Sequence, residues 1–165
     1  MCVRVPDRTT SEIQFVYEAI QLRDFVVMRM TALPAKWRDT LALPIITIAY
    51  DFAGELIYAN DLKQNNLHEL QLRIDTLVRA YGKLDSLESA QVLLFKKLRQ
   101  NPENFERQLI QKDKREQIRT ASQLRVETFL EELGKRISKC RELIDTQHTI
   151  DTQFLIELSR VTKSP

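Results

Sequence analysis

The sequence predicts an all-α protein, because three observations favour helices throughout. Only 3 glycines and 5 prolines occur in 165 residues, which leaves little material for the turns of an all-β fold. Residue types that favour helices dominate. Apolar residues recur at spacings of three and four over several long stretches. We expect one domain over residues 1–165, an antiparallel (up-and-down) four-helix bundle with a flexible leader at 1–10, an inserted helical segment at 87–120 and a C-terminal extension at 147–165.

The first helix is expected to begin near Ser11, which can cap it, and to end near Ala32. Its apolar residues fall on two faces. One face holds Ile13, Val16, Tyr17, Ile20 and Val27, and the other holds Phe15, Leu22, Phe25 and Met30. Two apolar faces suggest packing against the protein's own bundle and against a partner chain. A central helix of a monomer is the alternative.

Residues 33–60 form the most apolar part of the chain and are expected to supply its central helix. Pro34 ends the first helix, and the only tryptophan, Trp37, follows. The buried face is predicted to contain Leu41, Ile45, Ile48, Phe52 and Leu56. Pro44 favours a kinked continuous helix from about Lys36 to Asn60, and the alternative is a helix that begins at Leu43.

Residues 67–84 carry the most regular periodicity, after a polar connection in which two adjacent asparagines suit helix capping or left-handed conformations. The predicted seam consists of Leu67, Leu70, Ile74, Leu77, Tyr81 and Leu84. Polar residues, among them His68, Arg73 and Thr76, fall between the seam positions, and His68 is expected on the surface. Gly82 and Ser86 suggest a helix end and a restart, followed by a short helix at 87–99.

Pro102 predicts another stop and restart, and the polar stretch 105–120 fits an exposed helix or partial disorder. A last strong helix is expected at 121–146. Its seam consists of Val126, Leu130, Leu133, Ile137, Cys140 and Ile144. Gly134 beside this seam permits a close helix crossing. A final short helix, residues 150–161, is expected to cap the bundle.

The net charge of +2 is unevenly distributed. Residues 1–95 carry 10 basic and 12 acidic side chains, residues 96–141 carry 13 and 7, and residues 142–165 carry 2 and 4. A basic middle section attracts polyanions, although an ordinary solvated helix surface gives the same count.

The cysteines and the hydropathy indicate a cytoplasmic protein. Cys2 and Cys140 have no metal-ligand spacing, and Cys140 fits a small core residue. No run of uncharged apolar residues approaches the ~18 of a membrane span. We therefore expect no membrane association.

No motif for an enzyme is present, and we expect no catalytic residues, metal or cofactor. The three glycines cannot form a phosphate-binding loop, and His68 and His148 lie in separate predicted helices. Asp51 and Glu55 share a helix face at a spacing of four, as paired metal ligands do, but no Glu-x-x-His motif accompanies them. Solvated or ion-paired carboxylates are the simpler interpretation.

Eleven basic residues are candidates for phosphate contacts with nucleic acid. They are Lys96, Lys97, Arg99, Lys112, Lys114, Arg115, Arg119, Lys135, Arg136, Lys139 and Arg141. Lys135, Arg136 and Lys139 lie off the predicted core seam and can form a solvent-facing ridge, which would bind phosphates without reading bases. A solvated helix face is the alternative.

Several short segments resemble one known family. They are the Leu33-Pro34 turn with Lys36, Trp37 and Arg38, the segment LIYAN at 56–60, the segment LVRAYGKL at 77–84 and the segment FLEELGKRI at 129–137. In these, the chain resembles the four-helix bundle proteins related to the accessory variability determinants of diversity-generating retroelements, with ribosomal-S23-type bundles as cousins. The resemblance covers about residues 12–84 and 121–143.

The resemblance implies a bundle that assembles into a ring-like homopentamer and binds a reverse transcriptase and its template RNA, which supports mutagenic cDNA synthesis. It implies no catalytic residue. The matching positions are packing and turn-forming residues, so the resemblance at these positions implies a shared fold and not an activity. They are Trp37, Arg38, Tyr58, Asn60 and Gly134. The chain departs from the family in the residues near 87–120 and in the extension beyond residue 146.

Overall fold

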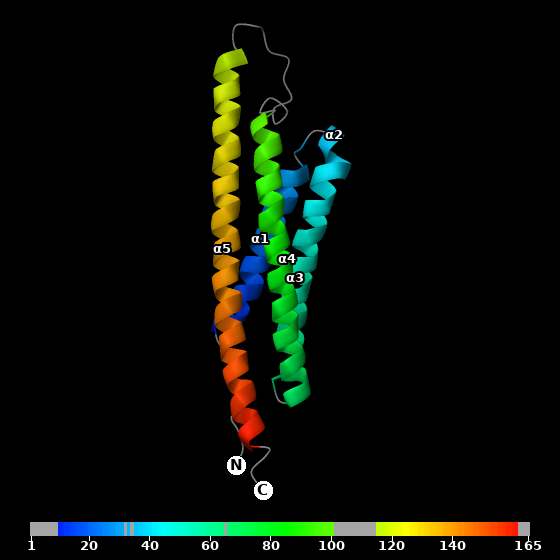
Figure 1. The fold of residues 1–165 in the computed structure, drawn as a ribbon, viewed down its shortest axis with the longest axis vertical. Coiled ribbons are helices and arrows are strands. Elements are labelled where there is room, and N and C mark those ends of the chain that lie inside the picture. The colour runs from blue at the N-terminus through cyan, green and yellow to red at the C-terminus, as the bar shows by residue number, and fades with distance from the viewer. Residues whose placement is uncertain (1–9, 32, 34, 65, 101–114, 162–165) are drawn as a thin grey trace.

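The computed structural model describes residues 10–31, 33, 35–64, 66–100 and 115–161, and every element in these ranges is a helix (Figure 1). The elements are α1 (Thr10–Thr31), α2 (Ala35–Trp37), the π-helix η1 (Arg38–Ala42), α3 (Leu43–Asp61), α4 (Leu67–Gln100) and α5 (Arg115–Val161). The prediction of an all-α protein is confirmed for this part of the chain, which contains four long helices and no strand.

The four long helices lie side by side along the long axis of the molecule (Figure 1). α1 packs against α3 and α5, and α4 packs against the same two helices. The core between them is almost entirely apolar. Its largest fully buried apolar side chains are Phe15, Leu22, Met30, Phe52, Leu56, Leu70, Leu77, Leu84, Leu87, Leu94 and Leu133.

Pro44 lies in the first turn of α3, a position that tolerates proline. The backbone just before it is wound as the π-helix η1, and the Leu43 N–H donates to the Arg38 carbonyl five residues back. α3 therefore begins at Leu43, as in the alternative prediction, while residues 35–42 are helical as in the favoured one.

The connection between α3 and α4 is fixed by an asparagine cap. The Asn66 side-chain oxygen accepts a hydrogen bond from the Glu69 N–H at 2.8 Å, in the first turn of α4. The Glu69 carboxylate accepts one from the Lys63 N–H at 3.0 Å. The prediction that the polar connection caps the next helix is thus confirmed at Asn66.

The predicted break near Gly82 and Ser86 is wrong, because α4 continues for 34 residues. The Ser86 hydroxyl donates to the Gly82 carbonyl at 2.9 Å, a bond within one helix rather than a cap. The buried positions Leu84, Leu87 and Leu94 continue the spacing of the preceding seam. Residues 87–100 therefore continue α4 and do not form a separate short helix, and the predicted stop at Pro102 lies outside the described residues.

The predicted division of the last part of the chain is also wrong. α5 is one helix of 47 residues, which includes residues 115–120 of the expected insertion and residues 147–161 of the expected extension. Its last turns continue in line with the rest of the helix rather than folding over the bundle end (Figure 1). The seam residues Leu130, Leu133, Ile137, Cys140 and Ile144 are buried as predicted, whereas the side chain of Val126 lies outside the described part.

A buried ion pair joins α4 to α5. The Arg73 Nε donates to the Asp151 Oδ2 at 2.7 Å, and the two side chains are 2% and 1% exposed. Another Arg73 nitrogen donates to the Ala59 carbonyl near the end of α3 at 3.0 Å. Gln147 donates to the other Asp151 oxygen at 2.9 Å, and Gln64 lies 3.3 Å from the same oxygen. The expectation that Arg73 falls outside the core is corrected, and so is that for Thr76, which is fully buried.

Removing one member of this pair should leave a buried charge without its partner. We expect Arg73→Met and Asp151→Leu each to lower the free energy of unfolding by about 3–5 kcal/mol. The double variant should lose less than the sum of the two, because it leaves no unpaired charge in the core. Urea unfolding measures all three, with Lys135→Met on the surface as an expected neutral control. Strictly additive losses would contradict this account.

The buried thiol of Cys140 provides a second prediction. Burial disfavours the thiolate and, with nearby Glu18, raises the pKa of Cys140 from 9.0 to about 12. Between these values the unfolded chain has lost the proton while the folded chain retains it. Stability should therefore fall as the pH rises from 9 to 12, and this contribution should be absent from Cys140→Ala. In a Cys2→Ser background, rapid labelling of Cys140 by a thiol reagent in the native protein at pH 8 would contradict the burial.

Candidate functional site

The eleven basic candidates do not form one surface. Lys112 and Lys114 lie outside the described residues. Arg99 lies in α4, and Arg115 and Arg119 lie in α5, but only the backbone of these three residues is described. The remaining candidates separate into two groups. Lys96 and Lys97 lie near the end of α4, and Lys135, Arg136, Lys139 and Arg141 lie along the middle of α5.

Each candidate on the middle of α5 is paired with a carboxylate. Lys135 contacts Glu131 at 2.7 Å, and Arg136 contacts Glu132 at 2.8 Å. The first pair raises the pKa of Lys135 and lowers the pKa of Glu131 through their hydrogen bond. Arg136 also lies over the Phe25 ring of α1, 4.7 Å from its centroid.

The other two candidates on α5 reach across to neighbouring helices. Lys139 contacts Glu18 of α1 at 2.6 Å, and Arg141 contacts both Asp85 and Glu88 of α4 at 2.6 Å. The hydrogen bond to Glu88 raises the pKa of Arg141. These cations therefore point to different sides of α5 and neutralise acids of the protein itself, which leaves little uncompensated charge for an external phosphate.

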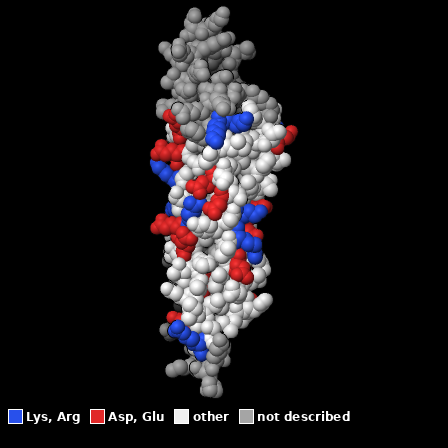
Figure 2. All heavy atoms as spheres, in the orientation of Figure 1, with Lys and Arg blue, Asp and Glu red and all other residues white. Residues whose placement is uncertain are grey.

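Lys96 and Lys97 are exposed and form no ion pair with any described residue. The end of α4 and the start of α5 lie at the same end of the molecule (Figure 1). Residues 96–119, which span these two ends, carry eight basic and four acidic side chains. On the face in Figure 2, acids and bases interleave along the upper half, a group of cations borders the upper edge of the described surface, and most of the lower half is uncharged.

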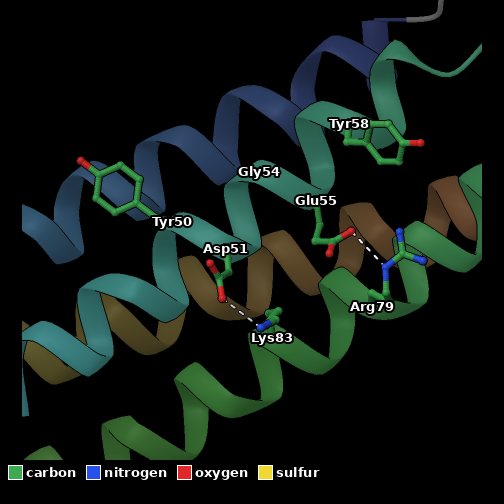
Figure 3. A pocket seen from close by; sticks show the side chains of 7 residues that line it. All are labelled: Tyr50, Asp51, Gly54, Glu55, Tyr58, Arg79 and Lys83. Atoms are coloured by element: carbon green, nitrogen blue, oxygen red, sulfur yellow. Dashed lines mark hydrogen bonds and ion pairs between the residues drawn. The ribbon is translucent and has the colours of Figure 1, made fainter.

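A groove of about 630 Å³ lies between α3 and α4 (Figure 3). Asp51 and Glu55 line its α3 side and contact Lys83 and Arg79 of α4 at 2.9 and 3.2 Å. Tyr50 and Tyr58 flank these pairs, and Gly54 lies between the two acids (Figure 3). Since Asp51 and Glu55 are ion-paired, the simpler of the two interpretations given for them fits the structure.

A second groove, of about 370 Å³, lies between α4 and α5 and contains Tyr81, Asp145 and His148. In the described part of the chain, no three His, Cys, Asp or Glu side chains are grouped so that they could hold a metal ion. His68 is exposed, as predicted.

The Arg73–Asp151 pair was missed at the sequence level, although the spacing held a signal. Gln147 and Asp151 follow Ile144 at three and seven residues, so they continue the seam of α5 with polar side chains. Arg73 likewise lies three residues after Leu70 and four before Leu77. Polar residues at core positions on two helices indicate a buried pair.

Comparisons of this chain with protein-family models, with curated proteins and with solved structures returned no match.

The ion pairs of the α3/α4 groove should contribute little to stability, because their side chains remain substantially exposed. We expect Arg79→Ala and Lys83→Ala each to change the free energy of unfolding by no more than ~1 kcal/mol. Urea unfolding beside Arg73→Met measures this directly. A loss as large as that of Arg73→Met would contradict the view that the groove is a surface feature.

Proposed function

We propose that the chain is a non-enzymatic accessory subunit, an antiparallel (up-and-down) four-helix bundle that forms homo-oligomers in the cytoplasm. In this proposal it binds a reverse transcriptase and its template RNA in a diversity-generating retroelement and supports mutagenic cDNA synthesis. The segments quoted above suggest this role, and the resemblance implies a pentamer.

The observation that supports the RNA part is the position of Lys96 and Lys97, which form no ion pair with any described residue. Lys96 and Lys97 are exposed where α4 ends, and the basic segment 96–119 connects this end to the start of α5. Phosphate contacts need cations that are not already neutralised, because affinity comes from release of the counterions around the nucleic acid. The end of the molecule is therefore a better candidate interface than the ridge of Lys135, Arg136 and Lys139.

RNA binding should depend on salt, and the dependence should come from this end. For a single-stranded RNA, each lost phosphate contact lowers the slope of log affinity against log salt by about 0.7. We expect Lys96→Ala/Lys97→Ala to reduce the slope, whereas Lys135→Ala/Lys139→Ala, which removes the same charge, should leave it unchanged. Fluorescence anisotropy across a salt series measures both variants.

A wild-type slope of zero would remove the RNA contact from the proposal. Equal reductions in both variants would remove its assignment to the α4 end. The partner is tested separately, by co-purification of the chain with the product of any reverse-transcriptase reading frame encoded next to its own.

A second candidate is a helical scaffold or regulatory module that binds protein and no nucleic acid. It is favoured by the pairing of the cations on α5 and by the apolar residues that α3 exposes, Leu43, Tyr50, Ile57 and Tyr58. An oligomer that is indifferent to RNA at low salt would favour this candidate.

A further inference from the structure

Near its end, α4 carries exposed apolar side chains next to exposed lysines. Val92 and Leu93 are 53% and 47% exposed, and Lys96 and Lys97, which follow them by four residues each, are exposed as well. Because residues four apart lie one above the other on a helix, these four side chains share one face of α4. Leu94, between the two pairs, is fully buried and points to the core. The outer face of α4 at this end is therefore both apolar and basic.

The two lysines are not neutralised by the part of the chain that the structure describes. Lys96 and Lys97 form no ion pair with any described residue, whereas Lys83, further down the same helix, contacts Asp51 at 2.9 Å. The charge that would complement this end of α4 must therefore come from a ligand, and that ligand is an anion. The apolar side chains then decide what else the ligand must present.

The two forms of RNA differ in what they can offer to Val92 and Leu93. An RNA duplex presents phosphates and 2′-hydroxyls, while its bases are paired and stacked inside. Contact with such a polar surface gives an exposed apolar side chain no hydrophobic gain. A single strand can turn its bases outward, so that their faces pack against side chains while the phosphates contact cations. The neighbouring apolar and basic side chains of α4 fit the single strand.

We propose that the outer face of α4 at its end binds single-stranded RNA in preference to duplex RNA. Lys96 and Lys97 contact phosphates, and Val92 and Leu93 pack against base faces. Aliphatic side chains read no hydrogen-bonding edge, so no preference for particular bases is expected. The inference rests on the RNA binding of the proposed function and names its substrate class. It agrees with the proposed role, because a polymerase copies a template whose bases are unpaired.

A salt series separates the two kinds of contact. The slope of log affinity against log salt counts phosphate contacts, whereas a contact between apolar groups shifts the whole line without changing its slope. We expect Val92→Ser/Leu93→Ser to keep the wild-type slope and to weaken single-strand binding about fivefold at every salt concentration, the scale of partial apolar burial. Binding of the duplex should not change. Lys96→Ala/Lys97→Ala should lower the slope for both forms of RNA.

Val78→Ser is the matched control. Val78 is a valine of the same helix and is 57% exposed, but its neighbour Arg79 is paired with Glu55. We expect this variant to bind both forms of RNA as the wild type does. The probe is a short fluorescent RNA without self-complementarity, used alone and annealed to its complement, and anisotropy is measured with the full-length chain. Circular dichroism shows that all variants are folded, as expected for changes at exposed positions.

The outcomes distinguish this inference from the function on which it rests. A wild type that binds neither form of RNA would overturn both. A salt-dependent wild type that binds duplex as tightly as single strand would overturn the inference alone, and so would equal losses in Val92→Ser/Leu93→Ser and Val78→Ser. If Val92→Ser/Leu93→Ser binds RNA normally but no longer co-purifies with the reverse transcriptase, the apolar pair contacts protein and the inference is wrong.

Discussion

The ion pair between Arg73 and Asp151 fixes how the helices of this protein align. α4 and α5 pack through long seams that repeat every seven residues, and such seams match almost equally well after a shift by one repeat. A buried charge removes this freedom, because any shift leaves Arg73 without Asp151 in an apolar environment. The hydrogen bond to the Ala59 carbonyl extends the constraint to α3, and the contact of the Arg73 guanidinium with the Phe15 ring, 6.0 Å from its centre, extends it to α1.

The electrostatics of the surface depend on the alignment that this pair sets. When α5 is held in place, Lys139 meets Glu18 of α1, and Arg141 lies between Asp85 and Glu88 of α4. The cations in the middle of the molecule therefore act within the protein. Lys96 and Lys97, near the end of α4, are exposed and form no ion pair with any residue in the described part of the chain. The described cations of one basic sequence region therefore differ in their surroundings: those in the middle of α5 pair with acids of the protein, and Lys96 and Lys97 are exposed.

α3 has more apolar surface than the rest of the described chain covers. Its inner residues complete the core, and its outer residues, with Tyr50 at their centre, remain exposed between two charged edges. A helix of this kind is stable in the single chain because of its buried face. Its outer face nevertheless keeps exposed apolar side chains beside the ion-paired groove.

The sequence alone determined the helical class, the buried seams and the inert environment of Cys140. These properties follow from side-chain spacing within one helix, which is local. The predicted breaks at Gly82 and before residue 150 were wrong, because packing between long helices overrides local breaker and capping signals. Only the tertiary structure decided which charges are neutralised and which are not. Arg73 and Asp151 are 78 residues apart in the chain. Other ion pairs also join residues that are far apart in the chain, and no periodicity within one helix specifies the partner on another.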